Sequence, residues 1–183
     1  MSTYLTSVLK QFQYYKSLGD KTIVQLSFNE LSKEFTQDLN SIAIMVKHLH
    51  GNMLSRWTNF LTEDGEKTWR QRDEEFVDNF TSKKELEATW NEGWSTLFNA
   101  IEQLSSEDLE KIIYIRNHGH TVTEAINRQL MHYAYHVGQI VFLGKLLKGD
   151  KWQSLSIPKG KSKDYNADKF SKNKTRRHFT EDL

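Results

Sequence analysis

The sequence contains no cysteine, one proline and nine glycines among its 183 residues. The absence of cysteine excludes disulfides, thiolate nucleophiles, iron–sulfur clusters and cysteine-ligated zinc modules. Any metal site in this chain must therefore be built from histidine and carboxylate side chains. Because proline and glycine are scarce, there are few breaks for short strands and turns, and long helices are expected.

The sequence also lacks long hydrophobic runs and a strong net charge. No stretch approaches the roughly 18 apolar residues of a membrane span, and the first residues lack the layout of a signal peptide. We therefore expect a cytoplasmic protein with no membrane partner. Lys and Arg number 25 against 24 Asp and Glu, which gives a net charge of +1. This balance provides no overall attraction to nucleic acid, so nucleic acid is not an expected partner.

Positive charge is concentrated near the C-terminus. Residues 151–177 contain nine Lys or Arg against two Asp, whereas the first 149 residues carry a net charge of −3. A solvated, partly disordered tail is the favoured interpretation. The alternative is a basic arm whose binding to DNA or RNA is steeply salt-dependent and is lost when residues 159–183 are deleted.

Apolar residues recur every three or four positions in four long segments, which is the spacing of amphipathic helices. These segments cover approximately residues 4–24, 38–61, 83–104 and 122–148. Ser27 with Glu30 predicts a capping box for a short helix, and residues 111–122 predict an extended loop or a hairpin. The expected fold is all-α: an antiparallel four-helix bundle over residues 1–158, with a short extra helix or hairpin, followed by a basic tail at 159–183.

The connection between the second and third predicted helices, residues 62–80, is longer than the roughly 2 to 8 residues usual in a bundle. We expect a loop with one helical turn, which serves as a crossover or a lid. The carboxylates in this segment are expected to be exposed. If the loop lies beside a metal site, Arg56 or Arg72 would bind an anionic substrate there.

His132 and His136 lie four residues apart in the last predicted helix, so both imidazoles project from one face and can chelate one divalent ion. That face continues into an apolar stripe, which predicts that the pair points into the bundle. The alternative is a pair of neutral core histidines bonded to the backbone or to Gln139. The motif HYAYH lacks the glutamate of HExxH zinc proteases, so that class is excluded.

A third ligand must come from elsewhere, because an open zinc site usually has three protein ligands. His48 and His50 lie in the second predicted helix and point roughly 160° apart. His48 shares a partly polar face with Asn52 and is preferred to His50 as the ligand. His118 and His120 flank a glycine and are expected in a solvated turn.

Three motifs carry a family resemblance: KHLHGN, SRWTNFLTEDGEKTWRQRDEEF and HYAYHVGQIVFLGK. They resemble the DinB/YfiT-like family of bacterial four-helix-bundle proteins, specifically an uncharacterised branch, over about residues 1–160. Members of that family bind a divalent metal, usually zinc or nickel, through three histidines. The resemblance implies that His48, His132 and His136 are the metal ligands and that His50 is a surface or interface residue.

The better understood members of that family are transferases that use low-molecular-weight thiols such as bacillithiol. The resemblance therefore implies a metal-dependent thiol transferase acting on a small electrophile. The alternative is a non-catalytic stress-related or binding protein whose metal is structural or absent. Since the chain has no cysteine, any thiol must come from solution, and at an open metal position it would become a thiolate near pH 7.

Polar residues near the histidines are further candidates. Asn52 lies one turn from His48, and Gln129 and Gln139 flank the HYAYH motif. Each is a candidate to support a ligand or to orient a substrate, and a purely structural role is the alternative.

The last predicted helix is apolar on more than one side. Leu130, Ala134 and Val141 lie opposite His132. A helix that is apolar nearly all round is either central in its domain or at a subunit contact. We therefore expect a homodimer.

Overall fold

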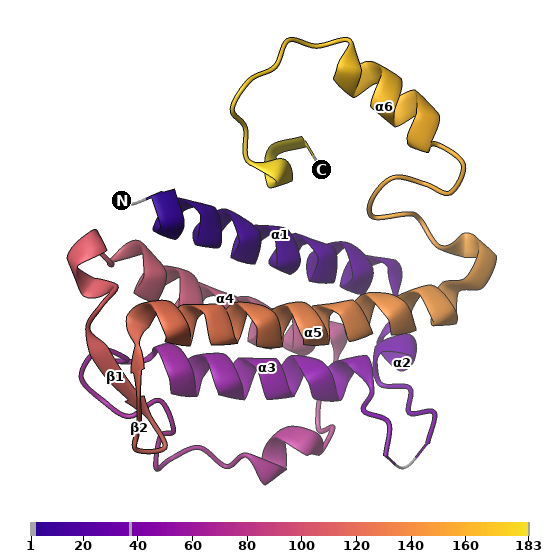
Figure 1. The fold of residues 1–183 in the computed structure, drawn as a ribbon. Coiled ribbons are helices and arrows are strands. Elements are labelled where there is room, and N and C mark those ends of the chain that lie inside the picture. The colour runs from indigo at the N-terminus through magenta and orange to yellow at the C-terminus, as the bar shows by residue number, and fades with distance from the viewer. Residues whose placement is uncertain (1–2, 37, 183) are drawn as a thin grey trace.

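The computed structural model describes residues 3–36 and 38–182. The described chain is mostly helical, with one small two-stranded sheet, as the all-α prediction requires in outline. The long helices are α1 (Thr3–Gln25), α3 (Ile42–Trp57), α4 (Lys83–Glu102) and α5 (Val122–Lys148). Helices α1 and α3 each pack against both α4 and α5, and α5 lies across the front of the molecule with α4 behind it (Figure 1).

Short elements lie between the long helices and after the last of them. They are α2 (Phe28–Leu31), η1 (Asp73–Phe76), η2 (Ser106–Asp108), β1 (Ile112–Ile115), β2 (His118–Thr121), η3 (Gly149–Lys151), α6 (Ser162–Phe170) and η4 (Phe179–Asp182). No helix in the described ranges combines the length and the apolar character needed to cross a membrane.

Capping residues explain where several helices begin and end. The Ser27 side chain accepts from the backbone of Glu30 in a capping box, which confirms the predicted start of α2. Thr121 caps α5 in the same way, with Glu124 as its partner, so that helix begins at Val122. At the other end of α5, Gly149 has φ 52°, a left-handed conformation that glycine adopts without a Cβ clash.

Helix α3 is shorter than the predicted segment 38–61. It begins at Ile42 because the Ser41 side chain caps it by accepting from the backbone N–H of Ile44. It ends at Trp57, and Asn59 follows with φ 49°, a left-handed conformation that asparagine tolerates better than most residues.

The core of the described chain contains an aromatic cluster that joins all four long helices. The Phe12 ring of α1 lies 6.4 Å from Trp57 of α3, 6.4 Å from Trp94 of α4 and 6.0 Å from Tyr133 of α5, measured between centroids. Buried Tyr133 accepts a 3.0 Å hydrogen bond from Trp57 Nε1 and donates a 3.0 Å bond to Asn52 Oδ1. The cluster fixes α3 relative to α5, the two helices that carry the predicted ligands.

The predicted hairpin is present as strands β1 and β2, which pair antiparallel. Its turn residues Arg116 and Asn117 have φ 55° and 62°, as a two-residue type I′ turn requires. The Asp64 carboxylate accepts 2.8 Å hydrogen bonds from both of their backbone N–H groups. The start of the connection after α3 is therefore fastened to the hairpin tip, near the N-terminal end of α5, and the rest of the connection runs below α3 toward α4 (Figure 1).

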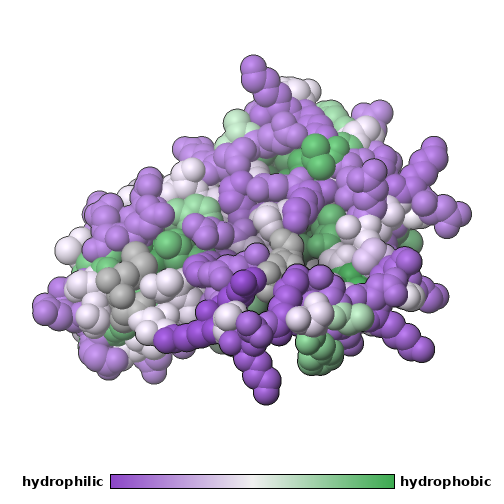
Figure 2. Space-filling view, turned by 90° about the horizontal axis from the view of Figure 1, so that it is seen from above, coloured by the Kyte–Doolittle hydropathy of each residue, from purple (hydrophilic) through white to green (hydrophobic). Residues whose placement is uncertain are grey.

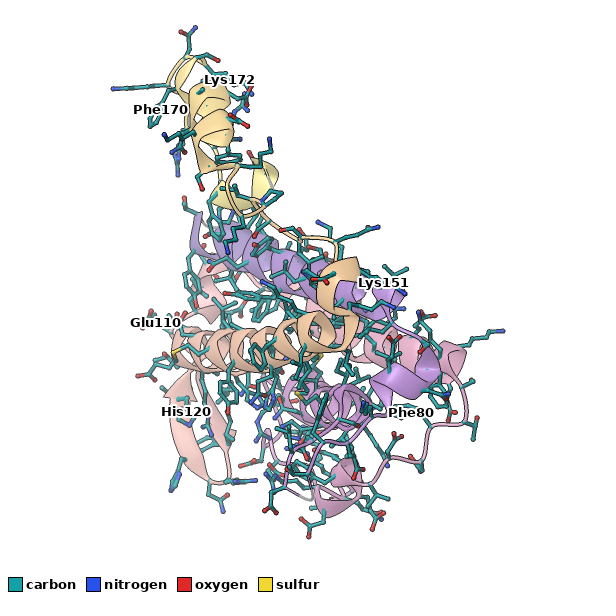
Figure 3. All side chains as sticks on the ribbon, turned by 90° about the vertical axis from the view of Figure 1, so that its right-hand side faces the viewer. Phe80, Glu110, His120, Lys151, Phe170 and Lys172 are labelled. Atoms are coloured by element: carbon teal, nitrogen blue, oxygen red, sulfur yellow. The ribbon has the colours of Figure 1, made fainter. Side chains whose placement is uncertain are left out.

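The C-terminal segment includes helix α6, which the sequence did not predict. This helix stands away from the four long helices, with Phe170 and Lys172 far from the body (Figures 1 and 3). The last residues return to α1, where His178 Nε2 lies 3.0 Å from Ser7 Oγ. Seen from above, the molecular face is mostly hydrophilic, with apolar atoms in separate groups (Figure 2).

The outer face of α5 exposes a row of large apolar side chains. They are Met131, Tyr135, Phe142 and Leu146. The residues named from the sequence, Leu130 and Val141, are instead partly buried against the core. The homodimer remains a prediction.

Candidate metal centre

Three histidines from two helices meet beside a cavity between α3 and α5. His48 lies on α3, and His132 and His136 lie one turn apart on α5. The Nε2 atom of His132 is 3.4 Å from that of His48 and 3.1 Å from that of His136. One ring nitrogen from each side chain lies within 4.8 Å of the others, so this group can hold a metal ion.

Hydrogen bonds hold the outer nitrogens of two of these rings. Nδ1 of His48 lies 2.9 Å from Oε2 of Glu75, and Nδ1 of His136 lies 2.9 Å from Oε1 of Gln139. Because both oxygens are acceptors, each Nδ1 carries a proton and each Nε2 presents a lone pair. His132 can donate a proton to only one of these two Nε2 atoms. The centre of the cluster therefore has more lone pairs than protons, which favours a bound cation.

Glu75 reaches His48 from η1, in the connection between α3 and α4. Arg70 donates to its carboxylate twice, from Nε at 2.7 Å and from an Nη atom at 2.9 Å. Gly51 of α3 leaves room for this carboxylate, because a Cβ at that position would collide with it. The prediction that the carboxylates of this connection are exposed is wrong for Glu75, whose side chain is 7% exposed. The two acidic residues before it are exposed as predicted.

Burial determines the charge of the cluster. Burial, with the nearby His136 and His48, lowers the pKa of His132 to about 3. Burial and the neighbouring His48 lower the pKa of His136 to about 4. Burial by itself would raise the pKa of Glu75, but hydrogen bonds from His48 and Arg70 hold it below its ordinary value. At neutral pH the two imidazoles of α5 are therefore neutral beside an ionised carboxylate, the states that metal binding requires.

The cluster borders a cavity of about 440 Å³. Phe76 of η1 stacks on the His48 ring with centroids 5.2 Å apart, and Arg72 lies over the outer face of Phe76, 5.1 Å from its centroid. The cavity is lined by His48, Asn52, Arg56, Arg70, Arg72, Phe76, Arg116, Arg128, Gln129, His132 and His136. Its size leaves room for a small molecule next to the three histidines.

Two of the predicted supporting residues have defined hydrogen bonds. Gln139 lies one turn beyond His136 and bonds to that ring, so it supports a histidine of the cluster. Asn52 lines the cavity, but its Oδ1 accepts from Tyr133, so this oxygen connects the cavity wall to the aromatic core. Both side chains are held in place by these contacts, which limits the freedom of the cluster.

Arg56 and Gln129, the other two predicted residues, line the cavity as well. Arg56 donates to the backbone carbonyl of Gly65 and to Glu66 Oε2, the latter at 3.0 Å. Burial lowers the pKa of Arg56, and the Glu66 carboxylate opposes that effect. Gln129 is 3% exposed. Neither side chain bonds to the three histidines, so both belong to the cavity wall.

The histidines outside the cluster have other surroundings. His50 Nε2 lies 3.0 Å from Glu92 of α4, so His48 and His50 point in different directions as the helical spacing predicts. His118 and His120 lie on β2, and His120 projects beside the hairpin (Figure 3). The geometry therefore favours His48 as the partner of the two histidines of α5.

Arg70 and Glu75 are the site residues that the sequence did not reveal. They lie in a polar connection without a helical or strand periodicity, so no pattern indicated which charged side chain turns inward. One signal was present in α3, where Gly51 falls between His48 and Asn52. A glycine inside a helix, next to a candidate ligand, often marks the close approach of another group.

The pKa shifts predict that the metal-free protein loses stability in acid. Between about pH 6.5 and pH 4, the unfolded chain protonates His132 and His136 while the folded chain keeps them neutral. Protons therefore favour unfolding, and the free energy of unfolding should fall as the pH is lowered through this window. Urea unfolding at several pH values tests this. A variant with both His132→Asn and His136→Asn should show a flatter profile, and an unchanged slope would contradict the assignment.

Comparisons with known proteins give a family. Residues 1–161 match a family described as "Protein of unknown function (DUF1572)". No curated protein matches the chain. The matched residues contain α1 to α5 and all three histidines of the cluster, and they end before α6.

Proposed function

The chain belongs to the DUF1572 family, whose function is unknown, and from its geometry we propose that it binds a divalent metal ion. The proposed ligands are the Nε2 atoms of His48, His132 and His136. The observation that carries this proposal is the set of Nδ1 contacts, because they turn lone pairs of two rings toward the third ring. Hydrogen bonding among the three imidazoles alone leaves at least one ring nitrogen without a partner.

The spacing of the nitrogens supports zinc or nickel as the ion. Two imidazoles bound tetrahedrally to zinc at the usual bond length would have nitrogens about 3.3 Å apart. The Nε2 atom of His132 lies 3.4 Å from that of His48 and 3.1 Å from that of His136. Imidazole is a suitable donor for both ions, and the contact of His48 with a carboxylate is a common support of zinc ligands.

We propose that the relationship to DinB/YfiT-like proteins extends to the architecture, an antiparallel four-helix bundle over residues 1–158 with a separate tail at 159–183. Four long helices with one histidine on α3 and a spaced pair on α5 support this proposal. The family match that ends at residue 161 supports the division between bundle and tail.

We propose further that the protein is a transferase that uses a low-molecular-weight thiol such as bacillithiol. A divalent ion would favour the thiolate form of such a thiol. The residues of the chain would orient the ligands and the substrates. Glu75 and Gln139 would orient two histidines, and the cavity beside them would admit the thiol and the electrophile. Phe76 covers one face of His48 and excludes water there.

Metal content tests the proposal. The full chain should contain about one zinc or nickel ion per molecule after exposure to the metal and desalting. His132→Ala should lose most of it, whereas His50→Ala, which removes a histidine of α3 that faces α4, should keep it. Elemental analysis of the three proteins, with circular dichroism to confirm folding, is the measurement. Equal metal content in the wild type and His132→Ala would overturn the proposal.

A further inference from the structure

Arginines converge on the cavity beside the three histidines. Five of them line it: Arg56, Arg70, Arg72, Arg116 and Arg128. They come from α3, from the connection after α3, from the hairpin tip and from α5. The side chains of Arg56 and Arg70 are buried, and buried charges need partners of opposite charge.

Two carboxylates, Glu66 and Glu75, form ion pairs with only three of these five arginines. Glu66 lies 3.0 Å from Arg56, 3.3 Å from Arg70 and 3.2 Å from Arg116. Glu75 takes the double hydrogen bond from Arg70 and is also the partner of His48. Within the described residues, the ion pairs of these five cations therefore involve two carboxylates, and a bound divalent metal would add further positive charge.

Arg72 and Arg128 have no carboxylate partner within residues 3–36 and 38–182. Arg72 is held by its contact with the Phe76 ring, and Arg128 lies 3.4 Å from a ring nitrogen of His120. Both side chains are exposed, and both line the cavity. They leave guanidinium donors available at its rim.

The cavity wall also contains two buried polar atoms without a hydrogen-bond partner in the described chain. They are Nε of Arg56, a donor, and Oε1 of Gln129, an acceptor. Both side chains are more than nine-tenths buried and line the cavity. Buried polar atoms are seldom left unpaired, so this wall is suited to a polar ligand rather than an apolar one.

We propose that this cavity binds a small ligand carrying an oxyanion, either a carboxylate or a phosphate, which Arg72 and Arg128 hold at the rim. Guanidinium groups bind both oxyanions through paired N–H donors. The remainder of the ligand would extend toward Gln129 and the three histidines. This proposal rests on the proposed function only in placing the rest of the ligand next to the three histidines. The arginines that hold the oxyanion do not require a bound metal.

Titration of the full chain with simple anions tests the proposal. The probes are inorganic phosphate and malate, with glycerol as an uncharged control, and calorimetry is done on the protein as purified and after metal removal. Saturable binding of phosphate or malate is expected, and the tighter of the two identifies the oxyanion. The double variant Arg72→Gln with Arg128→Gln should bind about tenfold more weakly or worse. The double variant Lys174→Gln with Arg176→Gln, in the C-terminal segment, removes the same two positive charges and should bind as the wild type does.

The outcomes separate this proposal from the metal proposal. No saturable binding of either anion to the wild type, or equal binding by the double variant, would overturn the oxyanion site. The double variant should retain its metal, since neither arginine contacts the three histidines. Anion binding that depends on Arg72 and Arg128, in a protein that takes up no zinc or nickel when exposed to either ion, would support the oxyanion site while contradicting the metal site.

Discussion

Replacing Glu75 with alanine is expected to lower the free energy of unfolding by about 3 kcal/mol, because removing one partner of a buried ion pair strands the other charge. The Arg70 side chain is 2% exposed. In the variant its remaining carboxylate partner would be Glu66, at 3.3 Å. The same substitution removes the acceptor of His48 Nδ1, so metal affinity should fall about 10- to 100-fold.

Glu74→Ala is the matched control, because Glu74 is the exposed carboxylate next to Glu75 in η1. Its effect on the free energy of unfolding should stay within about 0.5 kcal/mol. Urea unfolding followed by tryptophan fluorescence gives the stabilities, and competition with a chelator gives the metal affinities. Equal values for the two variants would show that Glu75 does not anchor the connection to α3.

Phe12→Ala is expected to lower the free energy of unfolding by about 3–5 kcal/mol, the usual cost of removing a buried aromatic ring. Phe12 is fully buried and contacts aromatic rings of the other three long helices. Its loss would leave a cavity where those helices meet. The four helices should therefore weaken together, in a single unfolding transition.

Phe142→Ala provides the comparison, since Phe142 has the same side chain on the outer face of α5 and is 67% exposed. It should change the free energy of unfolding by less than about 0.5 kcal/mol. Thermal and urea unfolding of both variants measure the difference. A cost for Phe142→Ala similar to that for Phe12→Ala would place the main stabilising cluster elsewhere.

Local patterns were sufficient to predict most helices of the fold. The capping box at Ser27 is a short-range signal, and it lies where the sequence places it. The threonine cap of α5 and the glycine after its last turn are signals of the same kind. The end of α3 was harder to predict, because Asn59 takes a left-handed conformation inside a segment that still contains helix-compatible residues. Helix α6 was missed because its charged residues show no apolar stripe.

In the candidate site, too, short-range patterns indicate some residues, whereas others depend on tertiary contacts. The spacing of His132 and His136 makes them a chelating pair on any α-helix, so the sequence alone indicated them. The choice between His48 and His50 needed the rotation of α3 about its axis, which the packing of the core sets. Glu75 depended on a tertiary contact of an irregular connection, which periodicity does not describe.

The X-ray absorption spectrum of the zinc-loaded full chain gives the most direct view of the proposed metal ligands. If His48, His132 and His136 bind the ion, the first shell contains three imidazole nitrogens at about 2.0–2.1 Å and one further light atom. The scattering pattern of the imidazole rings should then fit three rings. A shell of oxygens without imidazole scattering would contradict metal binding by the three histidines.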